Sequence, residues 1–184
     1  MSALLQTRDL SCVKDDRVLF EGMNLSLDAG QILLVEGKNG SGKTSLLRIL
    51  TGLSLPESGD VLWQGRPISE VGADYYEQVN YVGHHDGIKR DLTCLENLRL
   101  VQAMGKPLPI DLDEALDKVN LYRFGDNYVA TLSAGQKRRL ALARLVVTEA
   151  LLWIMDEPFT SLDKASMAMF QEMFEQHLEK GGVI

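Results

Sequence analysis

The stretch Gly37-Lys38-Asn39-Gly40-Ser41-Gly42-Lys43-Thr44 decides the fold that this sequence predicts. An apolar run at 32–35 precedes it with the length of a buried strand, and leucine and isoleucine recur after it at helical spacing. Glycines let backbone N–H groups turn inward around an anion, and a helix start adds its positive end there. The order of strand, glycine-rich loop, Lys-Thr and helix therefore predicts a phosphate-binding P-loop. In it, Lys43 would reach the β- and γ-phosphates of a nucleotide and the Thr44 hydroxyl would hold Mg²⁺.

Length, charge and composition limit the class of protein. The chain has 184 residues, 45% of them hydrophobic and 24% charged, which fits one globular domain with a full core. A net charge of −7 argues against a general polyanion binder, so we expect no nucleic-acid partner. The basic run Lys137-Arg138-Arg139 is typical of the solvated side of a helix.

Cysteine usage and hydropathy indicate a cytosolic protein. Cys12 and Cys94 lie far apart in the sequence, form no metal-binding pair, and are expected to be buried, reduced thiols. No apolar run approaches the ~18 residues of a membrane span, and the amino terminus shows no signal peptide. We therefore expect the chain to reach a membrane only through a partner.

The pattern of the chain alternates between strands and helices. Strands are expected at Ala3–Leu10, Val18–Leu27, Gln31–Val35, Asp60–Gln64, Val79–Val82 and Leu151–Met155, and the helix after the P-loop is expected to end at Gly52. From about residue 86 to 130 the pattern becomes helical. Helix starts are indicated at Thr93, Asp111, Ser133 and Asp163, the helix from Ser133 continuing to about Glu149 and the last one to Gly181.

The acidic pair Asp156-Glu157 follows a run of apolar residues that reads as a buried strand. A carboxylate at the end of a central strand lies beside a P-loop, where Asp156 could orient Mg²⁺ or its waters. Glu157, one residue later, could polarise the water that attacks the γ-phosphate. The pair is interpreted as a metal ligand and a general base.

A short motif, Leu-Ser-Ala-Gly-Gln at 132–136, points to one family. Together with the P-loop, the Met-Asp-Glu-Pro run at 155–158 and the Ser-Leu-Asp run at 161–163, it resembles the ATP-binding domain of ABC transporters over essentially the whole chain. The resemblance implies an α/β fold, with a P-loop NTPase core of ABC type, an amino-terminal antiparallel β subdomain and an inserted helical subdomain at about 86–130. One such domain would fill residues 1–184, with its carboxyl-terminal strand cut short.

The family resemblance also implies the site. ATP would contact the P-loop of one subunit and, across an ATP-dependent homodimer, the amino end of the helix after Ser133 in the other. The expected nucleotide-binding residues are Gly37, Lys38, Asn39, Gly40, Ser41, Gly42, Lys43, Thr44, Ser133, Gly135, Gln136 and Asp163. The expected Mg²⁺ ligands are Thr44 and Asp156, and the expected catalytic residue is Glu157.

Three longer stretches resemble the haem-exporter ATPases of cytochrome c biogenesis, namely residues 83–98, 135–145 and 152–163. They imply an ATPase that powers haem delivery with integral membrane subunits, as a peripheral protein on the cytoplasmic face of the inner membrane. The alternative is a soluble ABC-type ATPase acting on a nucleic-acid or ribosomal partner. Such proteins usually carry two fused ATPase domains or a long coiled coil, and this chain has neither.

Three positions depart from the family pattern. The glutamine expected after the strand at Tyr81-Val82 is absent, and His84 or His85 could take its place. Residues 12–17 contain no aromatic residue to stack on adenine, so the adenine contact stays open. The family's switch histidine would lie beyond Ile184.

Overall fold

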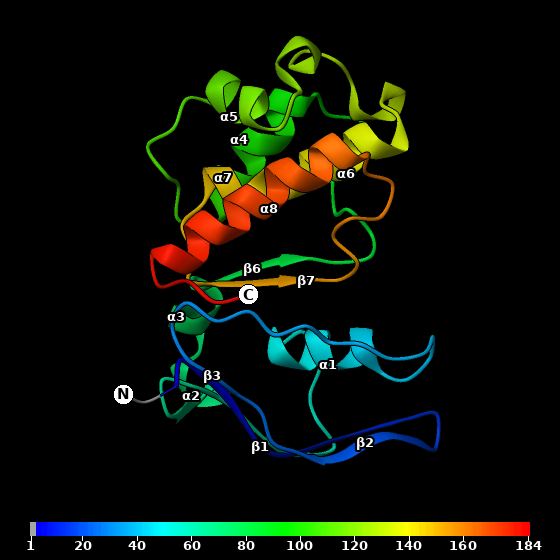
Figure 1. Ribbon diagram of the computed structural model, residues 1–184, viewed down its shortest axis with the longest axis vertical. Coiled ribbons are helices and arrows are strands. Elements are labelled where there is room, and N and C mark those ends of the chain that lie inside the picture. The colour runs from blue at the N-terminus through cyan, green and yellow to red at the C-terminus, as the bar shows by residue number, and fades with distance from the viewer. Residues whose placement is uncertain (1–2) are drawn as a thin grey trace. The chain divides into compact units, whose positions relative to one another are not determined.

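The computed structural model describes residues 3–184, which divide into two compact units (Figure 1). Of the described residues, the first unit comprises 3–79 and His177–Ile184, and the second comprises Asn80–Gln176. The helices expected between residues 86 and 130 lie in the second unit. The assignment of one domain with an inserted helical part stays a prediction.

The first unit is built on an antiparallel sheet, as expected for the amino-terminal part. Its strands follow the order β2-β1-β4-β5, and β3 pairs with β1. The bounds are β1 Leu5–Lys14, β2 Arg17–Met23, β3 Ser26–Leu27, β4 Ser58–Trp63 and β5 Arg66–Pro67.

Two tight turns set the register of this sheet. Asp15 and Asp16 both have positive φ, 51° and 58°, and join β1 to β2 with Lys14 opposite Arg17. Two positive φ values are the geometry of the hairpin turn whose twist matches that of the paired strands. Gln64 and Gly65, with φ of 51° and 80°, make the corresponding turn between β4 and β5.

The strand expected at Gln31–Val35 is absent from the described structure, so that prediction was wrong. The segment is extended and hydrogen-bonded to the chain end, because Leu33 donates to the carbonyl of Ile184 and Ile184 donates to that of Gln31. These bonds, at 2.8 and 3.1 Å, have the slant of a parallel pair. Apolar character alone indicated a strand, but a strand assignment also requires a ladder of hydrogen bonds with a neighbouring segment.

Helix α1, Lys43–Leu50, follows the P-loop and ends in the core of the first unit. Leu46, Ile49 and Leu50 are buried on one face of it. The buried Tyr75, at the end of α3 (Ala73–Tyr76), donates its hydroxyl hydrogen to the carbonyl of Leu50. Its ring meets that of Trp63 edge to face, with centroids 5.7 Å apart. Helix α2, Ile68–Val71, precedes α3.

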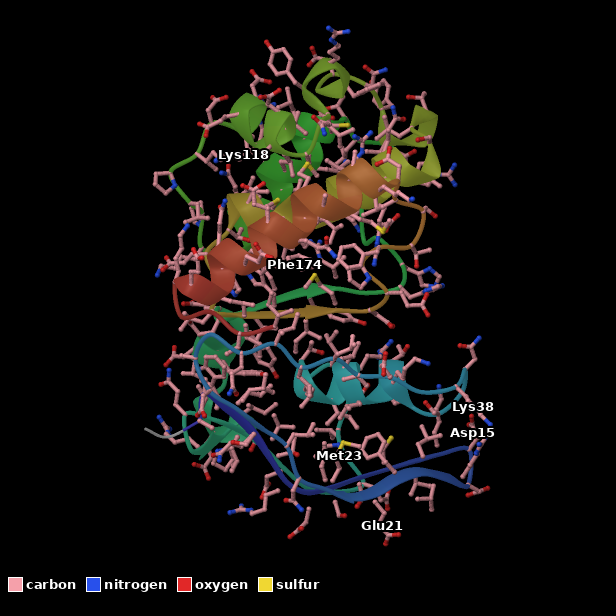
Figure 2. The ribbon with its side chains drawn as sticks, viewed as in Figure 1. Asp15, Glu21, Met23, Lys38, Lys118 and Phe174 are labelled. Carbon is pink, nitrogen blue, oxygen red and sulfur yellow. The ribbon has the colours of Figure 1, made fainter. Side chains whose placement is uncertain are left out.

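In the second unit, the helices lie on one side of a two-stranded sheet (Figure 1). Figure 1 shows β6 (Val79–Val82) and β7 (Leu152–Met155) as arrows that point the same way, so the pair is parallel. The other elements are α4 Cys94–Met104, α5 Leu112–Lys118, α6 Ala134–Leu142, α7 Arg144–Val147, α8 Lys164–Glu179, and the 3₁₀ turns Tyr122–Phe124 and Val129–Thr131. On α8, Phe174 packs against Trp153 of β7, with ring centroids 6.2 Å apart (Figure 2).

The helix starts read from the sequence are confirmed. The Thr93 side chain accepts from the Glu96 N–H, while the Glu96 carboxylate accepts from the Thr93 N–H, which completes a capping box. Asp111 accepts from two N–H groups at the start of α5. These contacts join residues two or three positions apart, so the sequence pattern predicts them directly.

The single helix expected from Ser133 to about Glu149 is wrong in its second half. It is interrupted at Ala143, whose N–H lies 2.9 Å from the Arg139 carbonyl and 3.2 Å from that of Leu140. Helix α7 then ends at Val147, because the chain pairs with a distant segment: Glu149 donates to Lys106 at 2.8 Å.

Both cysteines are free and buried, as expected. Burial raises the pKa of the Cys94 thiol to about 11, so that this thiol stays protonated at neutral pH.

Candidate functional site

The P-loop of the first unit has the backbone that glycine permits. Gly40 and Gly42 have φ of 79° and 100°, and α1 begins directly after Gly42. A Cβ on Gly37 would lie 2.6 Å from the Ser41 Oγ, and one on Gly42 would lie 3.0 Å from the Leu19 side chain. Positive φ at Gly40 and Gly42 therefore favours glycine at those two positions, and the close Leu19 side chain further restricts Gly42, so that the loop forms a concave cradle of main chain.

Lys43 lies across this cradle. Its Nζ donates to the carbonyl oxygens of Gly37 at 2.7 Å and of Lys38 at 3.1 Å. A loop with its ammonium group folded inward, at a helix start, fits the phosphates of a nucleotide. Asn39 and Thr44 complete the stretch, so all eight P-loop residues named from the sequence are contiguous in this unit.

In the second unit, α6 begins with a complete capping box. The Ser133 hydroxyl oxygen accepts from the Gln136 N–H at 3.2 Å, and the Gln136 side chain accepts from the Ser133 N–H at 2.8 Å. Gly135 is held close to another loop, since a Cβ there would lie 2.8 Å from the Ser161 carbonyl oxygen. The amino end of α6 and the loop at Ser161 therefore form one tight contact.

The acidic pair follows β7 directly. Asp156 is buried, with 5% exposure, and its N–H donates to the Val82 carbonyl of β6 at 2.8 Å. Glu157 has φ of 50°, a left-handed conformation that is uncommon outside glycine and turns the chain sharply away from the strand. Its Oε2 lies 3.8 Å from the His84 Nδ1 and accepts from the Thr160 hydroxyl at 3.4 Å.

The structure distinguishes the two histidines that follow β6. His84 contacts Glu157 and lines the same pocket, whereas His85 contacts His84 edge to face, with ring centroids 5.5 Å apart. Of the two, His84 has the better position to act on the Glu157 carboxylate.

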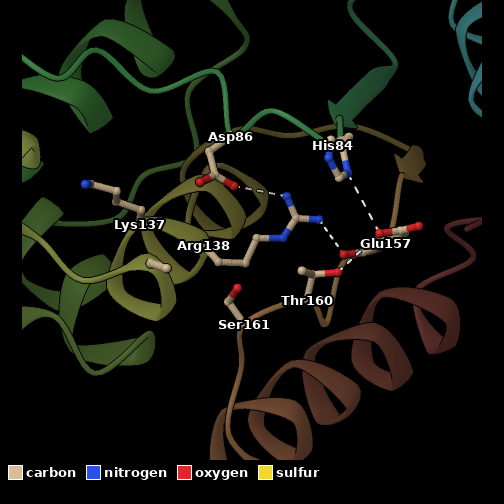
Figure 3. Close-up of a pocket in the computed structure, with 8 residues that line it drawn as sticks. His84, Asp86, Lys137, Arg138, Glu157, Thr160 and Ser161 are labelled. Carbon is tan, nitrogen blue, oxygen red and sulfur yellow. Dashed lines mark hydrogen bonds and ion pairs between the residues drawn. The ribbon is translucent and has the colours of Figure 1, made fainter.

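These groups surround a pocket of about 260 Å³ within the second unit (Figure 3). The pocket combines carboxylates, cations and hydroxyls with the first residue of α6. Its lining is His84, Asp86, Ala134, Lys137, Arg138, Glu157, Thr160 and Ser161. Of the residues expected in the site, Glu157 lines the pocket itself, and Asp156, Ser133 and Gly135 adjoin residues that do. The P-loop and Thr44 belong to the first unit.

The interpretation of the basic run at 137–139 as a solvated helix face was wrong for Arg138, which is only 4% exposed. The sequence did contain one sign that Arg138 is buried: it lies one helical turn before the apolar Leu142, which is buried on the same face of α6. Its charge is compensated by carbonyl groups distant in the sequence, and the local pattern gives no sign of them.

Asp163 is placed as a helix cap. Its Oδ1 accepts from the Ser166 N–H at 2.8 Å at the start of α8. This hydrogen bond lowers the pKa of the Asp163 carboxyl, with a smaller contribution from the charge of Arg139.

A glycine-lined loop closed by a lysine at a helix start, in an α/β chain with a buried strand ending in two carboxylates, defines a P-loop nucleotide-binding protein. Residues 20–160 match the ABC transporter family. The cytochrome c biogenesis ATP-binding export protein CcmA of Escherichia coli K12 is 46% identical over 181 residues, covering 98% of this chain and 86% of that protein. The CcmA protein of Shigella flexneri is likewise 46% identical over the same shares.

Solved structures agree on the fold. The ATP-binding subunit of an ABC transporter matches with a TM-score of 0.85 at 25% identity, covering 98% of this chain and 77% of that one. The chain belongs to the ABC transporter family, and it is an ATP-binding, ATP-hydrolysing domain of that family. None of the helices within residues 3–184 combines the length and apolar character that a membrane crossing requires.

Proposed function

We propose that this chain is the ATP-hydrolysing subunit of an export complex that serves cytochrome c biogenesis. The observation that carries the proposal is the 46% identity to CcmA over 98% of the chain, which includes every motif of the candidate site. Haem as the molecule delivered rests on the family resemblance of residues 83–98, 135–145 and 152–163. The chain would act as a peripheral protein on the cytoplasmic face of the inner membrane, together with integral membrane subunits.

The residues of the P-loop would hold ATP by its phosphates. The Lys43 ammonium would exchange the two loop carbonyls for β- and γ-phosphate oxygens, while loop N–H groups and the start of α1 meet the remaining charge. Bound Mg²⁺ would neutralise phosphate charge in the transition state. Its protein ligands would be Thr44 and Asp156, a small set that suits an ion usually held by one or two carboxylates and substrate phosphates.

Glu157 would act as the general base. Its carboxylate lies on the pocket, is 51% exposed, and is held by contacts from His84 and Thr160. A carboxylate in hydrogen-bond reach of a water can take its proton as the water attacks the γ-phosphate. His84 would orient that carboxylate.

A second copy of the chain would complete each site. The first turn of α6 has free N–H groups next to the capping box of Ser133 and Gln136, a suitable end for a γ-phosphate bound by the partner copy. Two ATP molecules would then lie between two copies, and hydrolysis would separate them. Asp163 would shape the loop that carries Ser161 by capping α8.

Complementation tests the biological role. The chain would be expressed in an E. coli K12 strain that lacks its own CcmA, and covalent haem in c-type cytochromes would be measured by in-gel peroxidase staining. We expect the wild-type chain to restore cytochrome c, and Lys43→Ala and Glu157→Gln to fail at equal expression. Failure of the wild-type chain, with normal ATPase activity and membrane association, would refute the export role.

Light scattering tests the homodimer. Glu157→Gln should be monomeric without nucleotide and dimeric with MgATP, because ATP binds but is not consumed. A monomer at saturating ATP would contradict the shared site.

A further inference from the structure

Arg138 of α6 lines the pocket and uses all its hydrogen-bonding capacity on two loops; Figure 3 draws its bonds to Asp86 and Glu157. A guanidinium group has five N–H donors. Nε donates to the Pro158 carbonyl at 3.1 Å, and Nη2 donates to the carbonyls of Asp156 and Glu157, each at 2.8 Å. Nη1 donates to the Gly83 carbonyl at 3.0 Å and to the Asp86 carboxylate at 3.1 Å.

The acceptors belong to two loops that carry the chemistry. Three of them are successive carbonyls of the turn after β7, in which Glu157 takes its left-handed conformation. The other two, Gly83 and Asp86, flank the His84 loop after β6. One planar side chain therefore ties α6, the turn of Glu157 and the loop of His84 together.

Because Arg138 is buried, its side chain can be replaced by no other that satisfies the same acceptors. A buried guanidinium group is tolerated only when its hydrogen bonds are satisfied and its charge is compensated. Asp86 supplies the one paired carboxylate, and carbonyl dipoles supply the rest. Neither lysine, with three donors, nor glutamine, with two, can reproduce five bonds in a fixed plane.

We propose that Arg138 is the positioning residue of the hydrolytic site, which fixes the backbone turn of Glu157 and thereby aims its carboxylate at the attacking water. Arg138 acts through main-chain carbonyls, so its role is in the rate of hydrolysis and not in holding ATP. This inference rests on the proposed role of Glu157 as general base.

Steady-state and single-turnover ATPase measurements on the purified full chain test the proposal, with ATP affinity measured separately by calorimetry. Arg138→Gln should lower kcat about 10²-fold, the cost of misplacing a catalytic group by about 1 Å. ATP affinity should stay within about twofold of wild type, because phosphate binding is assigned to the P-loop. Asp86→Asn, which keeps an acceptor but removes the paired charge, should lower kcat by a smaller factor.

A matched control is Arg144→Gln. Arg144 is a second desolvated arginine of the same unit, and its Nη1 donates to the Tyr81 carbonyl within β6 and not to the carbonyls of the turn of Glu157 that hold Arg138. It should lower the unfolding midpoint as Arg138→Gln does, yet leave kcat within about twofold of wild type.

Double variants separate positioning from a general structural role. In a Glu157→Gln background, Arg138→Gln should lower the residual rate less than about threefold, because groups that act as one unit are strongly non-additive. An equal fold-loss in both backgrounds, or an unchanged kcat in the folded Arg138→Gln variant, would overturn the proposal. If Arg138→Gln does not fold, Arg138→Lys takes its place, and the same two outcomes, an equal fold-loss in both backgrounds or an unchanged kcat, would overturn the proposal. A wild-type rate of ATP hydrolysis in the single variant Glu157→Gln would instead show that Glu157 is not the general base.

Discussion

Replacing Gly135 by alanine would place a methyl group 2.8 Å from the carbonyl oxygen of Ser161. Ordinary van der Waals contact begins at 3.4 Å, so the start of α6 and the loop must separate by about 0.6 Å. Overpacking of this size costs about 1–3 kcal/mol of unfolding free energy. The same shift moves the N–H groups that we assign to the γ-phosphate, and a misplacement of this order lowers kcat by roughly 10- to 100-fold.

Stability would be measured by urea unfolding and activity by ATP hydrolysis. The chain has one tryptophan in each unit, Trp63 and Trp153, so a Trp63→Phe background makes fluorescence report on the second unit alone. With a denaturant slope of about 2 kcal/mol/M, the midpoint should fall by about 0.5–1.5 M. Wild-type midpoint and wild-type kcat in Gly135→Ala would refute the close approach.

A second substitution sharpens the test. Ser161 has φ of 65°, a left-handed conformation that glycine adopts without strain. Adding Ser161→Gly to Gly135→Ala should let the loop retreat and recover part of both losses. Ser161→Gly alone should be close to neutral. Strict additivity of the two substitutions would show that they do not share a contact.

Three further outcomes are expected. Lys43→Ala should abolish tight MgATP binding, because the cation that lies across the P-loop is lost; near-normal affinity by calorimetry would contradict the assignment. Tyr75→Phe should destabilise the first unit by about 1–3 kcal/mol, since the Leu50 carbonyl loses its buried donor, and Trp63 fluorescence in a Trp153→Phe background would report the lowered urea midpoint. Asp163→Asn should destabilise the second unit at neutral pH. The lowered pKa of Asp163 means that its stabilisation is present above the ordinary carboxyl pKa and is lost as the pH falls through its folded value. The difference between wild type and Asp163→Asn should therefore vanish in acid, and a difference that persists there would contradict the Ser166 cap.

Features whose interacting residues lie within a few positions of one another could be predicted from the sequence alone. The P-loop depends on glycines that lie one, three and six positions before Lys43, and both capping boxes join residues three positions apart. Strands in the first unit and the strand at Leu152–Met155 followed from local apolar patterns and turns, whereas the antiparallel arrangement of the first unit followed from the family resemblance. Short-range geometry of this kind depends on backbone preferences that the residues carry in any context.

Tertiary structure decided where a local pattern needed a distant partner. The apolar segment 31–35 is joined to residues 182–184 by backbone hydrogen bonds and is not part of a strand. The helix after Ser133 stops at Val147, since residues 147–149 pair with 106–108. A hydrophobic period cannot indicate either outcome, because both depend on which other segment of main chain is at hand.

The candidate site shows the same division. The roles proposed for Lys43, Asp156 and Glu157 followed from motif and spacing. The choice of His84 over His85 required the 3.8 Å distance between the His84 Nδ1 and the Glu157 Oε2. The burial of Arg138 required five acceptors, none nearer than 18 residues along the chain. A charged side chain in a helix is stable in water or among hydrogen-bonding carbonyl groups, and helical spacing can place it on a buried face but cannot show which carbonyl groups surround it. Only the folded chain brings these acceptor groups together around Arg138.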